Sequence, residues 1–251
     1  MQRKLVFAYG ILSYLTFLAV FLYAIGFIGN FLVPKAIDSA PQVPFLQALL
    51  INLGLLGLFA VQHSLMARKP FKRWLTRYIP AAAERSTYVM ASNILMIGLF
   101  LLWQPMGGVV WNVADPMGST ILYALYGLGW LILLYATFLV DHFELFGLKQ
   151  IWCHLRGTAF VTPRFTQRQA YQWIRHPIYL GWLIIFWATP TMTLAHLVFA
   201  LASTGYIFVG IWFEERDLVA AHPEYAEYRR RVPMVLPIAG RQRLRPASET
   251  A

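Results

Sequence analysis

Residues 175–191 read RHPIYLGWLIIFWATPT, and they decide how the C-terminal half of this chain is arranged. Two basic residues and Pro177 precede an uncharged apolar run, which Thr189-Pro190-Thr191 interrupts before a second apolar run continues to Phe213. The first run, Ile178–Thr189, would rise roughly 18 Å as a helix, whereas the hydrocarbon core of a bilayer is roughly 30 Å thick. The pattern therefore favours two arms that enter the membrane and return as a hairpin.

The rest of the chain is also apolar enough to be embedded in a membrane. Of its 251 residues, 59% are hydrophobic and only 13% are charged, which excludes an ordinary soluble domain. A spanning helix needs about 20 apolar residues, and four uncharged stretches reach that length: Leu5–Val33, Phe45–Ala67, Tyr88–Val113 and Thr120–Val140. The first is too long for the apolar core of a signal peptide, so we expect a retained span. The sequence thus predicts an all-α, polytopic integral membrane protein with four transmembrane helices, a C-terminal re-entrant helical hairpin and a cytoplasmic tail.

Positive charge predicts which side of the membrane is cytoplasmic. All of the 21 Lys and Arg residues except Lys35 lie on one side if the last apolar segment is a hairpin. A single crossing by Ile178–Phe213 would send the basic tail to the other side, against the positive-inside rule. We therefore expect both termini and the connections 68–87 and 142–176 to be cytoplasmic. The net charge of +10 then reflects loops that face anionic lipid, which disfavours nucleic-acid binding.

Several classes of site are disfavoured by the residues present. The single Cys153 can form neither an internal disulfide nor a thiolate metal cluster. Metal ligation by His142 and Glu144 is disfavoured because two ligands do not make a site, so no metal is expected. Gly127 and Gly129 fit close helix packing better than a nucleotide-binding loop, since no strand flanks a glycine-rich turn.

Five groups of polar residues are predicted to lie at the cytoplasmic ends of the helices, at one membrane depth. They are Gln62-His63-Ser64, Glu84-Arg85-Ser86, Asp141-His142 with Glu144, Arg175-His176 with Tyr179, and Glu214-Glu215-Arg216-Asp217. Ionisable groups at the edge of the bilayer interior are costly enough to indicate function, and together these would line a pocket open to the cytoplasm. Simpler interpretations stay open: His63 could be a hydrogen-bonded residue between packed helices, and Asp141 with Glu144 could be solvated charges at a helix end.

The start of the hairpin has the chemistry of an anion site. Pro177 suits the first turn of a helix, where its missing N–H is not needed. The free N–H groups of that turn, beside Arg175 and His176, favour a carboxylate or another anion. Tyr179 and Trp182 lie one helical turn apart and add an aromatic face.

The returning arm adds the opposite charge. It is expected to bring Glu214 and Glu215 to the same depth, where a carboxylate can pair with Arg175 or meet an amino group. A site with both signs of charge and an aromatic wall suits a zwitterionic ligand with a ring system and a sulfonium. S-adenosylmethionine has these features.

Three motifs in residues 171–237 carry a resemblance to a known superfamily. RHPIYLG, Glu214-Glu215-x-x-Leu218 and HPEYAEYRRRVPMVLP together resemble the C-terminal pattern of the membrane methyltransferases that include isoprenylcysteine carboxyl methyltransferase and the phospholipid N-methyltransferases. The matching segment of that superfamily binds S-adenosylmethionine. The resemblance therefore implies cofactor binding by the matching residues, which are Arg175, His176, Tyr179, Gly181, Glu214 and Glu215. Trp182 joins them through the aromatic face, and Tyr225 and Tyr228 through the amphipathic lid segment Glu224–Val232.

The N-terminal half resembles a narrower group. VQHSLMARKPFKRWLTRYIPAAAERSTYV, residues 61–89, and DHFELFGLKQ, residues 141–150, are similar to the NnrU-like bacterial membrane proteins, the group that contains methanethiol S-methyltransferase. This resemblance implies a location in the bacterial inner membrane. It also implies S-adenosylmethionine-dependent S-methylation of methanethiol to dimethyl sulfide at the cytoplasmic face.

Methylation of a thiol requires that the two sulfur atoms are held close and that the thiol loses its proton. His63 and Glu84 are the candidate proton acceptors, and His142 is a further candidate. Arg85 or Arg175 is expected to stabilise the thiolate.

Three other functions are compatible with parts of the pattern. A methyltransferase for another thiol, a prenylcysteine or a lipid would keep the same cofactor site, and an NnrU-like protein could have no enzymatic activity. A transporter is disfavoured because no charged residue lies in the middle of the four spans. We expect one integrated domain and a monomer, with residues 1–140 forming the four-helix region and 141–251 the cofactor-binding region. The polar tail after Gly240 is expected to fray.

Overall fold

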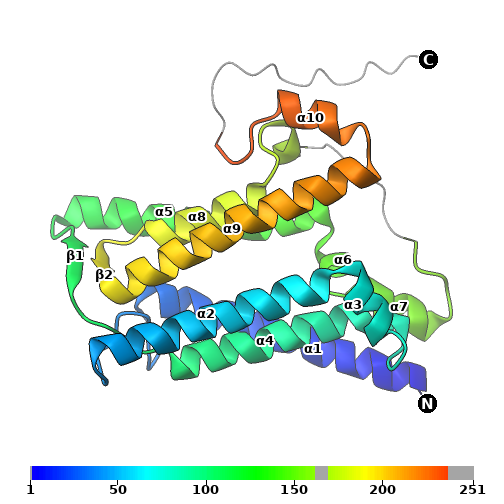
Figure 1. Ribbon diagram of the computed structural model, residues 1–251, viewed down its shortest axis with the longest axis horizontal. Helices are drawn as coiled ribbons and strands as arrows, with labels where there is room; N and C mark the ends of the chain where they lie inside the picture. The colour runs from blue at the N-terminus through cyan, green and yellow to red at the C-terminus, as the bar shows by residue number, and fades with distance from the viewer. Residues whose placement is uncertain (1, 162–168, 237–251) are drawn as a thin grey trace.

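The computed structural model describes residues 2–161 and 169–236 of the chain, and these residues are mostly helical (Figure 1). Five helices are long and apolar enough to cross a membrane. They are α1 (Gln2–Gly29), α2 (Phe45–Ala67), α4 (Glu84–Leu102), α5 (Pro116–Val140) and α9 (Leu194–Ala221). The predicted all-α, multi-pass architecture is therefore confirmed. The tail after Gly240 lies outside the described residues.

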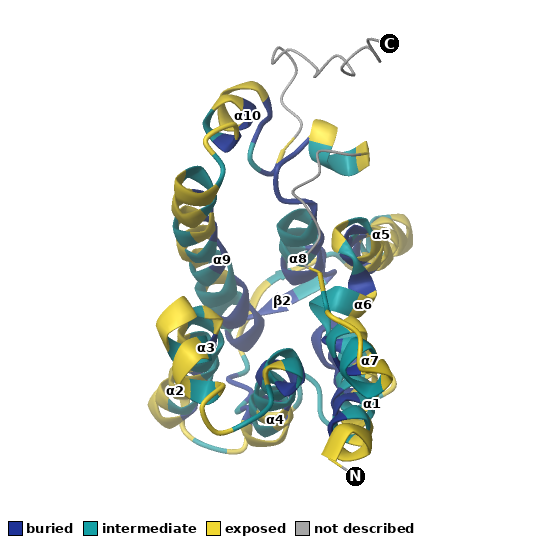
Figure 2. Ribbon diagram, turned by 90° about the vertical axis from the view of Figure 1, so that its right-hand side faces the viewer, coloured by how far each residue is buried: buried dark blue, intermediate teal, exposed yellow. Residues whose placement is uncertain are grey.

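Shorter elements connect the long helices. They are α3 (Lys69–Leu75), η1 (Ala81–Ala83), β1 (Val109–Asn112), α6 (His142–Leu145), α7 (Leu148–Arg156), η2 (Gln169–Gln172), α8 (Pro177–Trp187), β2 (Thr191–Thr193) and α10 (Tyr225–Arg231). The two strands lie at one end of the bundle, which we call the strand end, and α10 lies at the opposite end, which we call the α10 end (Figure 1). Figure 2 shows exposed residues on the outward sides of α2 and α5, where large apolar side chains such as Leu50 and Leu131 suit contact with lipid.

The predicted first and fourth spans differ from the structure only at one end. Helix α1 stops at Gly29 rather than Val33, because Asn30 and Leu32 adopt left-handed backbone conformations with φ of 61° and 58°. Helix α5 starts at Pro116 rather than Thr120, because the side chain of Asp115 accepts a hydrogen bond from the N–H of Gly118 and caps the helix.

The prediction that the third span continues to Val113 is wrong. Helix α4 runs from Glu84 to Leu102, and the uncharged residues after it form β1 instead. Trp103, directly after the helix, has φ of −49° and ψ of 135°, and Pro105 follows it, so the helix ends here; Gly107 and Gly108, with φ of 66° and 61°, then turn the chain toward β1. The length of an uncharged stretch limits how many residues can lie in the bilayer. It does not predict that every one of those residues is helical.

The predicted break at Thr189-Pro190-Thr191 separates α8 from α9, and it is held by a two-stranded sheet. Strand β2 pairs antiparallel with β1, with Val109 opposite Thr193 and Asn112 opposite Thr191. The two arms are unequal: α8 has 11 residues, whereas α9 has 28 and is long enough to span a membrane alone.

Helices α5 and α8 approach each other closely through two glycines. A Cβ atom on Gly181 would lie 2.8 Å from the backbone N of Leu133 and 2.9 Å from the carbonyl oxygen of Gly129. A Cβ atom on Gly129 would lie 2.9 Å from Ile185. The interpretation of Gly129 as a packing residue is confirmed, and Gly181 has the same role on the facing helix.

A buried polar network closes the strand end. The Asp38 carboxylate accepts hydrogen bonds from Asn30 Nδ2 at 2.7 Å and from the hydroxyl of Thr193, and it lies 3.2 Å from His196 Nδ1. His196 is fully buried at the start of α9, and its Nε2 lies 3.1 Å from the carbonyl oxygen of Phe186. The network therefore ties the loop after α1 to both arms of the hairpin.

Candidate active site

The start of α8 is held in place by a segment from the C-terminal region. The backbone N–H of Arg175 donates to the carbonyl oxygen of Pro233 at 3.0 Å, and that of His176 donates to Met234 at 3.1 Å. We call residues 232–236 the C-terminal strap. The strap thus fixes the backbone directly before α8, from which the side chains of Arg175 and His176 project.

The carboxylate of Glu215 contacts both of those side chains and compensates the charge of Arg175. Its Oε1 atom lies 3.0 Å from Arg175 Nη1 and 3.0 Å from His176 Nε2, and all three side chains are less than a tenth exposed. The second carboxylate oxygen, Oε2, lies 3.9 Å from Arg229 Nη1 on α10. Despite the short ion pair, Nε and Nη1 of Arg175 make no hydrogen bond of normal geometry to any described residue. A buried guanidinium therefore has N–H groups to offer a ligand.

Glu214 is the open carboxylate of the pair. Its side chain is 46% exposed, and its Oε2 accepts a hydrogen bond from the hydroxyl of Tyr179 at 3.1 Å. The same oxygen lies 3.9 Å from His176 Nδ1. Adjacent glutamates thus have different roles: Glu215 balances buried positive charge, and Glu214 presents negative charge to the solvent-accessible side.

Helix α10 covers these charges with two tyrosines. Tyr225 and Tyr228 are 2% and 3% exposed, and they pack with Leu218 and Val219 of α9. The hydroxyl of Tyr228 donates to the carbonyl oxygen of Tyr171 at 2.6 Å. Burial raises the pKa of both tyrosines, so their hydroxyls stay protonated. The predicted lid segment thus contains a helix, α10, and lies against the charged residues.

Gly181 and Trp182 point away from this charged cluster, toward α5. The indole ring of Trp182 lies 5.5 Å from that of Trp130 and stacks on Phe186, also at 5.5 Å between centroids. Of the predicted cofactor residues, these two therefore belong to the contact between α5 and α8, whereas Tyr179 belongs to the charged cluster.

A second polar cluster surrounds His63 on α2. His63 Nε2 lies 2.7 Å from the hydroxyl of Tyr88 on α4, and Nδ1 lies 3.3 Å from Ser92 Oγ. The hydroxyl of Ser92 also lies 3.3 Å from Gln62 Oε1 and 3.0 Å from the carbonyl oxygen of Tyr88. His63 is therefore hydrogen-bonded through both ring nitrogens between two helices.

The predicted residues at the start of α4 lie beside this cluster. The guanidinium of Arg85 sits over the ring of Tyr88, 5.2 Å from its centroid, while its Nε donates to the carbonyl oxygen of Leu145 at 2.7 Å. Glu84 lies 3.7 Å from Lys72 Nζ in an ion pair at the membrane edge. Arg85 thus contacts Tyr88, which is hydrogen-bonded to His63, whereas Glu84 forms an ion pair with Lys72.

His142 lies in a separate aromatic cluster. Its Nε2 is 2.8 Å from the hydroxyl of Tyr14, its Nδ1 is 2.8 Å from Thr137 Oγ1, and its ring stacks on Phe138 at 4.5 Å. Burial lowers the pKa of His142, although the negative charge of Asp141 opposes this effect.

Asp141 and Glu144 are charges at a helix end. Asp141 caps α6 by accepting from the N–H of Glu144 at 3.2 Å, and it pairs with Lys149. Burial raises the pKa of Asp141, but the hydrogen bond and the charge of Lys149 outweigh it and hold that pKa below its usual value. Burial, reinforced by Asp141, raises the pKa of Glu144. Within the described residues, no group of three or more His, Cys, Asp and Glu is placed to hold a metal ion.

Two tyrosines that the sequence analysis did not select connect the clusters. The hydroxyl of Tyr206 on α9 shares a 3.1 Å hydrogen bond with Ser64, next to His63. Its ring also lies 6.4 Å from that of His63, and a Cβ atom on Gly210, one turn further along α9, would lie 3.9 Å from the hydroxyl of Tyr179, which donates to Glu214. Tyr88 is one turn after Glu84 and Tyr206 is two turns before Glu214, so helical periodicity from the selected acids was the signal that could have found them.

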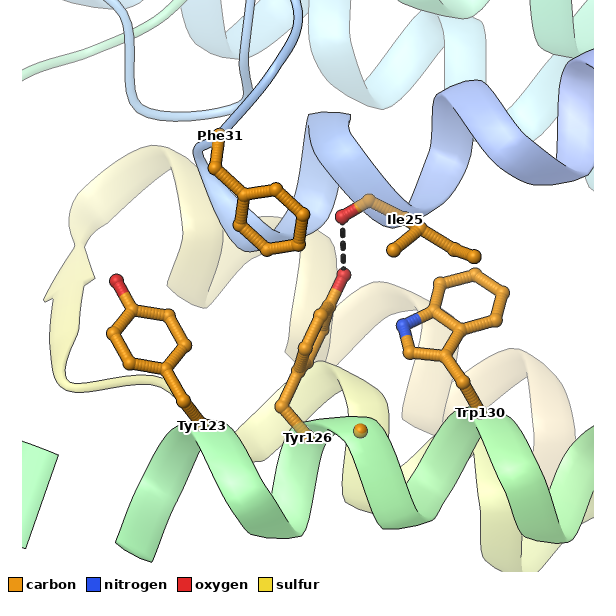
Figure 3. A pocket seen from close by; sticks show the side chains of 6 residues that line it. Ile25, Phe31, Tyr123, Tyr126 and Trp130 are labelled. Atoms are coloured by element: carbon orange, nitrogen blue, oxygen red, sulfur yellow. Dashed lines mark hydrogen bonds between the residues drawn. The ribbon is translucent and has the colours of Figure 1, made fainter. Parts of the chain in front are cut away.

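Two cavities lie near these clusters, and the smaller adjoins the charged cluster. The larger, of about 480 Å³, lies between α1 and α5 near the strand end and is lined by Ile25, Phe31, Tyr123, Tyr126, Gly127 and Trp130 (Figure 3). It is apolar, and Tyr126 donates its hydroxyl proton to the carbonyl oxygen of Ile25 at 2.6 Å. The smaller, of about 220 Å³, lies at the α10 end against Glu215 and Arg229. We place the candidate site at the α10 end because the charged residues converge there.

Five long apolar helices and a charged cluster at one end define a multi-pass membrane protein with a candidate ligand site. Similar proteins of known name identify the family within this class. The chain is 49% identical to methanethiol S-methyltransferase from Crocosphaera subtropica over 96% of its own length and 95% of the relative's. It is 50% identical to the protein of that name from Mycobacterium tuberculosis over 94% and 98% of the two lengths. The chain belongs to the methanethiol S-methyltransferase family.

More distant similarity extends beyond bacteria. The chain is 32% identical to Nurim from Sus scrofa, over 66% of each of the two chains. No family model matches the chain. No solved structure matches it either.

Proposed function

We propose that this protein is an enzyme that transfers a methyl group from S-adenosylmethionine to methanethiol, giving dimethyl sulfide at the cytoplasmic face of a bacterial inner membrane. The observation that carries the proposal is that relatives named for this reaction share about half of their residues with the chain along nearly its whole length. The charged cluster at the α10 end supplies the chemistry that a zwitterionic methyl donor needs.

The buried groups of the cluster fit the methyl donor. When bound, S-adenosylmethionine supplies an electrophilic methyl group on a sulfonium sulfur. Arg175, whose Nε makes no hydrogen bond to the described residues, would hold its carboxylate, and the open carboxylate of Glu214 would hold its amino group. His176 and Glu215 keep Arg175 in place. Tyr179 orients Glu214 through a hydrogen bond. Tyr225 and Tyr228 on α10 cover the cluster and exclude water from it.

Proton removal from methanethiol is assigned to the second cluster. His63 is the preferred acceptor, since its Nε2 lies 2.7 Å from the hydroxyl of Tyr88 and its ring lies 6.4 Å from that of Tyr206 on α9, whereas Glu84 pairs with Lys72. Arg85, over the ring of Tyr88, adds positive charge that favours a thiolate. His142 has no part in this proposal, because it bonds to Tyr14 and Thr137 in a separate cluster rather than to residues that contact α9.

The membrane topology is part of the proposal. Four helices, α1, α2, α4 and α5, span the bilayer, and α8 with α9 forms a re-entrant hairpin whose tip is paired with β1. Both termini then lie in the cytoplasm, together with the basic loops at the α10 end. The protein acts as a monomer and as one integrated domain, in which the four-helix region (residues 1–140) supplies the thiol side and residues 141–251 the donor side.

The test is headspace detection of dimethyl sulfide from purified protein in detergent, given methanethiol and S-adenosylmethionine. Glu214→Gln keeps the shape of the side chain but removes its charge, and we expect it to weaken donor binding at least tenfold by calorimetry. Asp217→Asn, one turn further along α9 and paired with Arg68 at the surface, is the matched control and should bind normally. Donor binding without product would redirect the search to larger thiols, prenylcysteine or lipids. Absence of both would contradict the proposal and leave a non-enzymatic role.

A further inference from the structure

The protonation state of His63 follows from the groups around it. The hydroxyl of Ser92 has one proton and lies within hydrogen-bonding distance of two carbonyl oxygens, those of Gln62 and Tyr88. Carbonyl oxygens only accept, so the proton of Ser92 goes to one of them. Ser92 Oγ must then accept from His63 Nδ1, 3.3 Å away. The network therefore assigns the proton of the neutral His63 ring to Nδ1.

This tautomer determines what the other ring nitrogen does. With the proton on Nδ1, Nε2 carries a lone pair, and the hydroxyl of Tyr88 donates to it at 2.7 Å. The basic nitrogen of His63 is therefore already occupied by a phenol. A thiol can therefore give its proton to His63 Nε2 only by displacing Tyr88 or by passing the proton through the oxygen of Tyr88.

The surroundings of Tyr88 suit a proton relay in which its oxygen stays neutral. Its side chain is buried, so a lasting negative charge on the oxygen would be costly, although the Arg85 guanidinium lies over the ring, 5.2 Å from its centroid. The ring of Tyr206 on α9 lies 6.4 Å from that of His63. One turn further along α9, a Cβ atom on Gly210 would lie 3.9 Å from the hydroxyl of Tyr179, which donates to Glu214. The His63–Tyr88 pair is therefore next to the part of α9 that leads to the candidate donor site.

We propose that Tyr88 is the residue that takes the proton from methanethiol and that His63 acts through it; this inference rests on the proposed function. The thiol proton moves to the oxygen of Tyr88 as the phenolic proton of Tyr88 moves to His63 Nε2, which leaves an imidazolium, a neutral tyrosine and a thiolate. The thiolate lone pair forms the new bond to the methyl carbon, and the electrons of the broken carbon–sulfur bond stay on the donor's sulfur. His63 then returns one proton to water through the same hydroxyl.

A second Tyr–His pair in the same bundle provides an internal comparison. Tyr14 and His142 share a 2.8 Å hydrogen bond, and the other nitrogen of His142 meets a hydroxyl, that of Thr137. This pair lies among Phe138, Phe143 and Phe146 rather than beside the donor site. Tyr14→Phe therefore removes the same kind of hydrogen bond from the same kind of environment, and it should leave turnover within about twofold of the parent.

The experiment compares two thiols of different acidity in the parent and in Tyr88→Phe, His63→Gln, the double variant and Tyr14→Phe. Methyl transfer is followed as S-adenosylhomocysteine formed. General base catalysis contributes about 10²–10⁴-fold, and a more acidic substrate depends on it less. We expect Tyr88→Phe to lower kcat with methanethiol about 100-fold, but with hydrogen sulfide, a smaller and more acidic thiol, about tenfold. His63→Gln should lower kcat by the same factors as Tyr88→Phe. The double variant should have the same kcat as either single variant, because the two residues act as one unit.

A readout that is independent of turnover tests the hydrogen-bond assignment. Nitrogen NMR of ¹⁵N-histidine-labelled protein should show one ring with a protonated Nδ1 and an accepting Nε2, and Tyr88→Phe should shift that Nε2 signal. Calorimetry should show donor binding within twofold of the parent in every variant. An Nε2-protonated His63, equal losses with both thiols, or near-normal turnover by Tyr88→Phe would each overturn the proposal. A parent that methylates neither thiol would instead refute the proposed function, and this inference would fall with it.

Discussion

The two adjacent glutamates on α9 should respond in opposite ways to the same small change. Glu215→Gln removes a buried negative charge that lies 3.0 Å from both Arg175 and His176, so the buried Arg175 guanidinium loses its compensation. Glu214→Gln removes a charge from a side chain that is 46% exposed and whose main contact is the hydroxyl of Tyr179. We expect the first change to cost stability and the second to cost donor binding.

The size of the stability effect follows from the geometry. Two unit charges 3.0 Å apart attract by about 5.5 kcal/mol at an effective dielectric constant of about 20. Glutamine keeps a dipole that still accepts hydrogen bonds, and breaking one side of a buried pair typically costs about 3–5 kcal/mol. We therefore expect Glu215→Gln to lower the free energy of unfolding by about 3 kcal/mol. For a chain of this size each kcal/mol lowers Tm by about 2–4 °C, so the expected drop is about 6–12 °C.

Both quantities can be measured on the same samples. Tryptophan fluorescence during heating gives Tm in detergent, and calorimetry gives the affinity for S-adenosylmethionine. We expect Glu214→Gln to unfold within about 2 °C of the parent and yet bind the donor at least tenfold more weakly. Equal Tm values for the two variants would refute the assignment of Glu215 as the compensating charge.

Three further predictions concern stability. Asp38→Ala leaves Thr193 and His196 without their shared acceptor, so it should lower the unfolding free energy by about 3 kcal/mol in a denaturant titration while donor affinity stays within twofold. Gly181→Ala places a methyl group against the backbone of Leu133 and should cost about 1–3 kcal/mol, whereas Gly205→Ala, with open space around it, should stabilise by about 0.5–1 kcal/mol in the same assay. Because burial lowers the pKa of His142, the unfolded chain binds more protons below its usual pKa of about 6.5; Tm should therefore fall as pH drops through that value, and less steeply in His142→Gln.

The long apolar helices could be predicted from composition alone, because a bilayer imposes a minimum length that few other structures require. Their ends could not, because backbone conformation decides them. Residues 103–113 are as uncharged as the helix before them, but Gly107 and Gly108 turn the chain and β1 follows. The pairing of β1 with β2 joins segments far apart in the sequence, and periodicity within either segment carries no information about it.

The charged cluster at the α10 end was predictable because its residues are rare in an apolar chain. Arg175, His176, Glu214 and Glu215 are brought together as the hairpin requires. The partners of apolar residues on other helices were less predictable: the position of Trp182 one turn after Tyr179 does not reveal that its ring packs against that of Trp130 on α5. Tyr88 and Tyr206 were missed because a tyrosine inside an apolar helix usually fills space, and only its hydroxyl partners across helices reveal another role.

The C-terminal strap also sets an order of events during synthesis. Its carbonyl oxygens, at Pro233 and Met234, fix the backbone of Arg175 and His176, yet these residues leave the ribosome only after α8 and α9 have been made. A nascent chain can therefore insert all of its long helices before its charged cluster is complete. A messenger truncated just before codon 233 would yield a chain that contains all of the long helices but an incomplete charged cluster, so quality control based on insertion alone would not detect it.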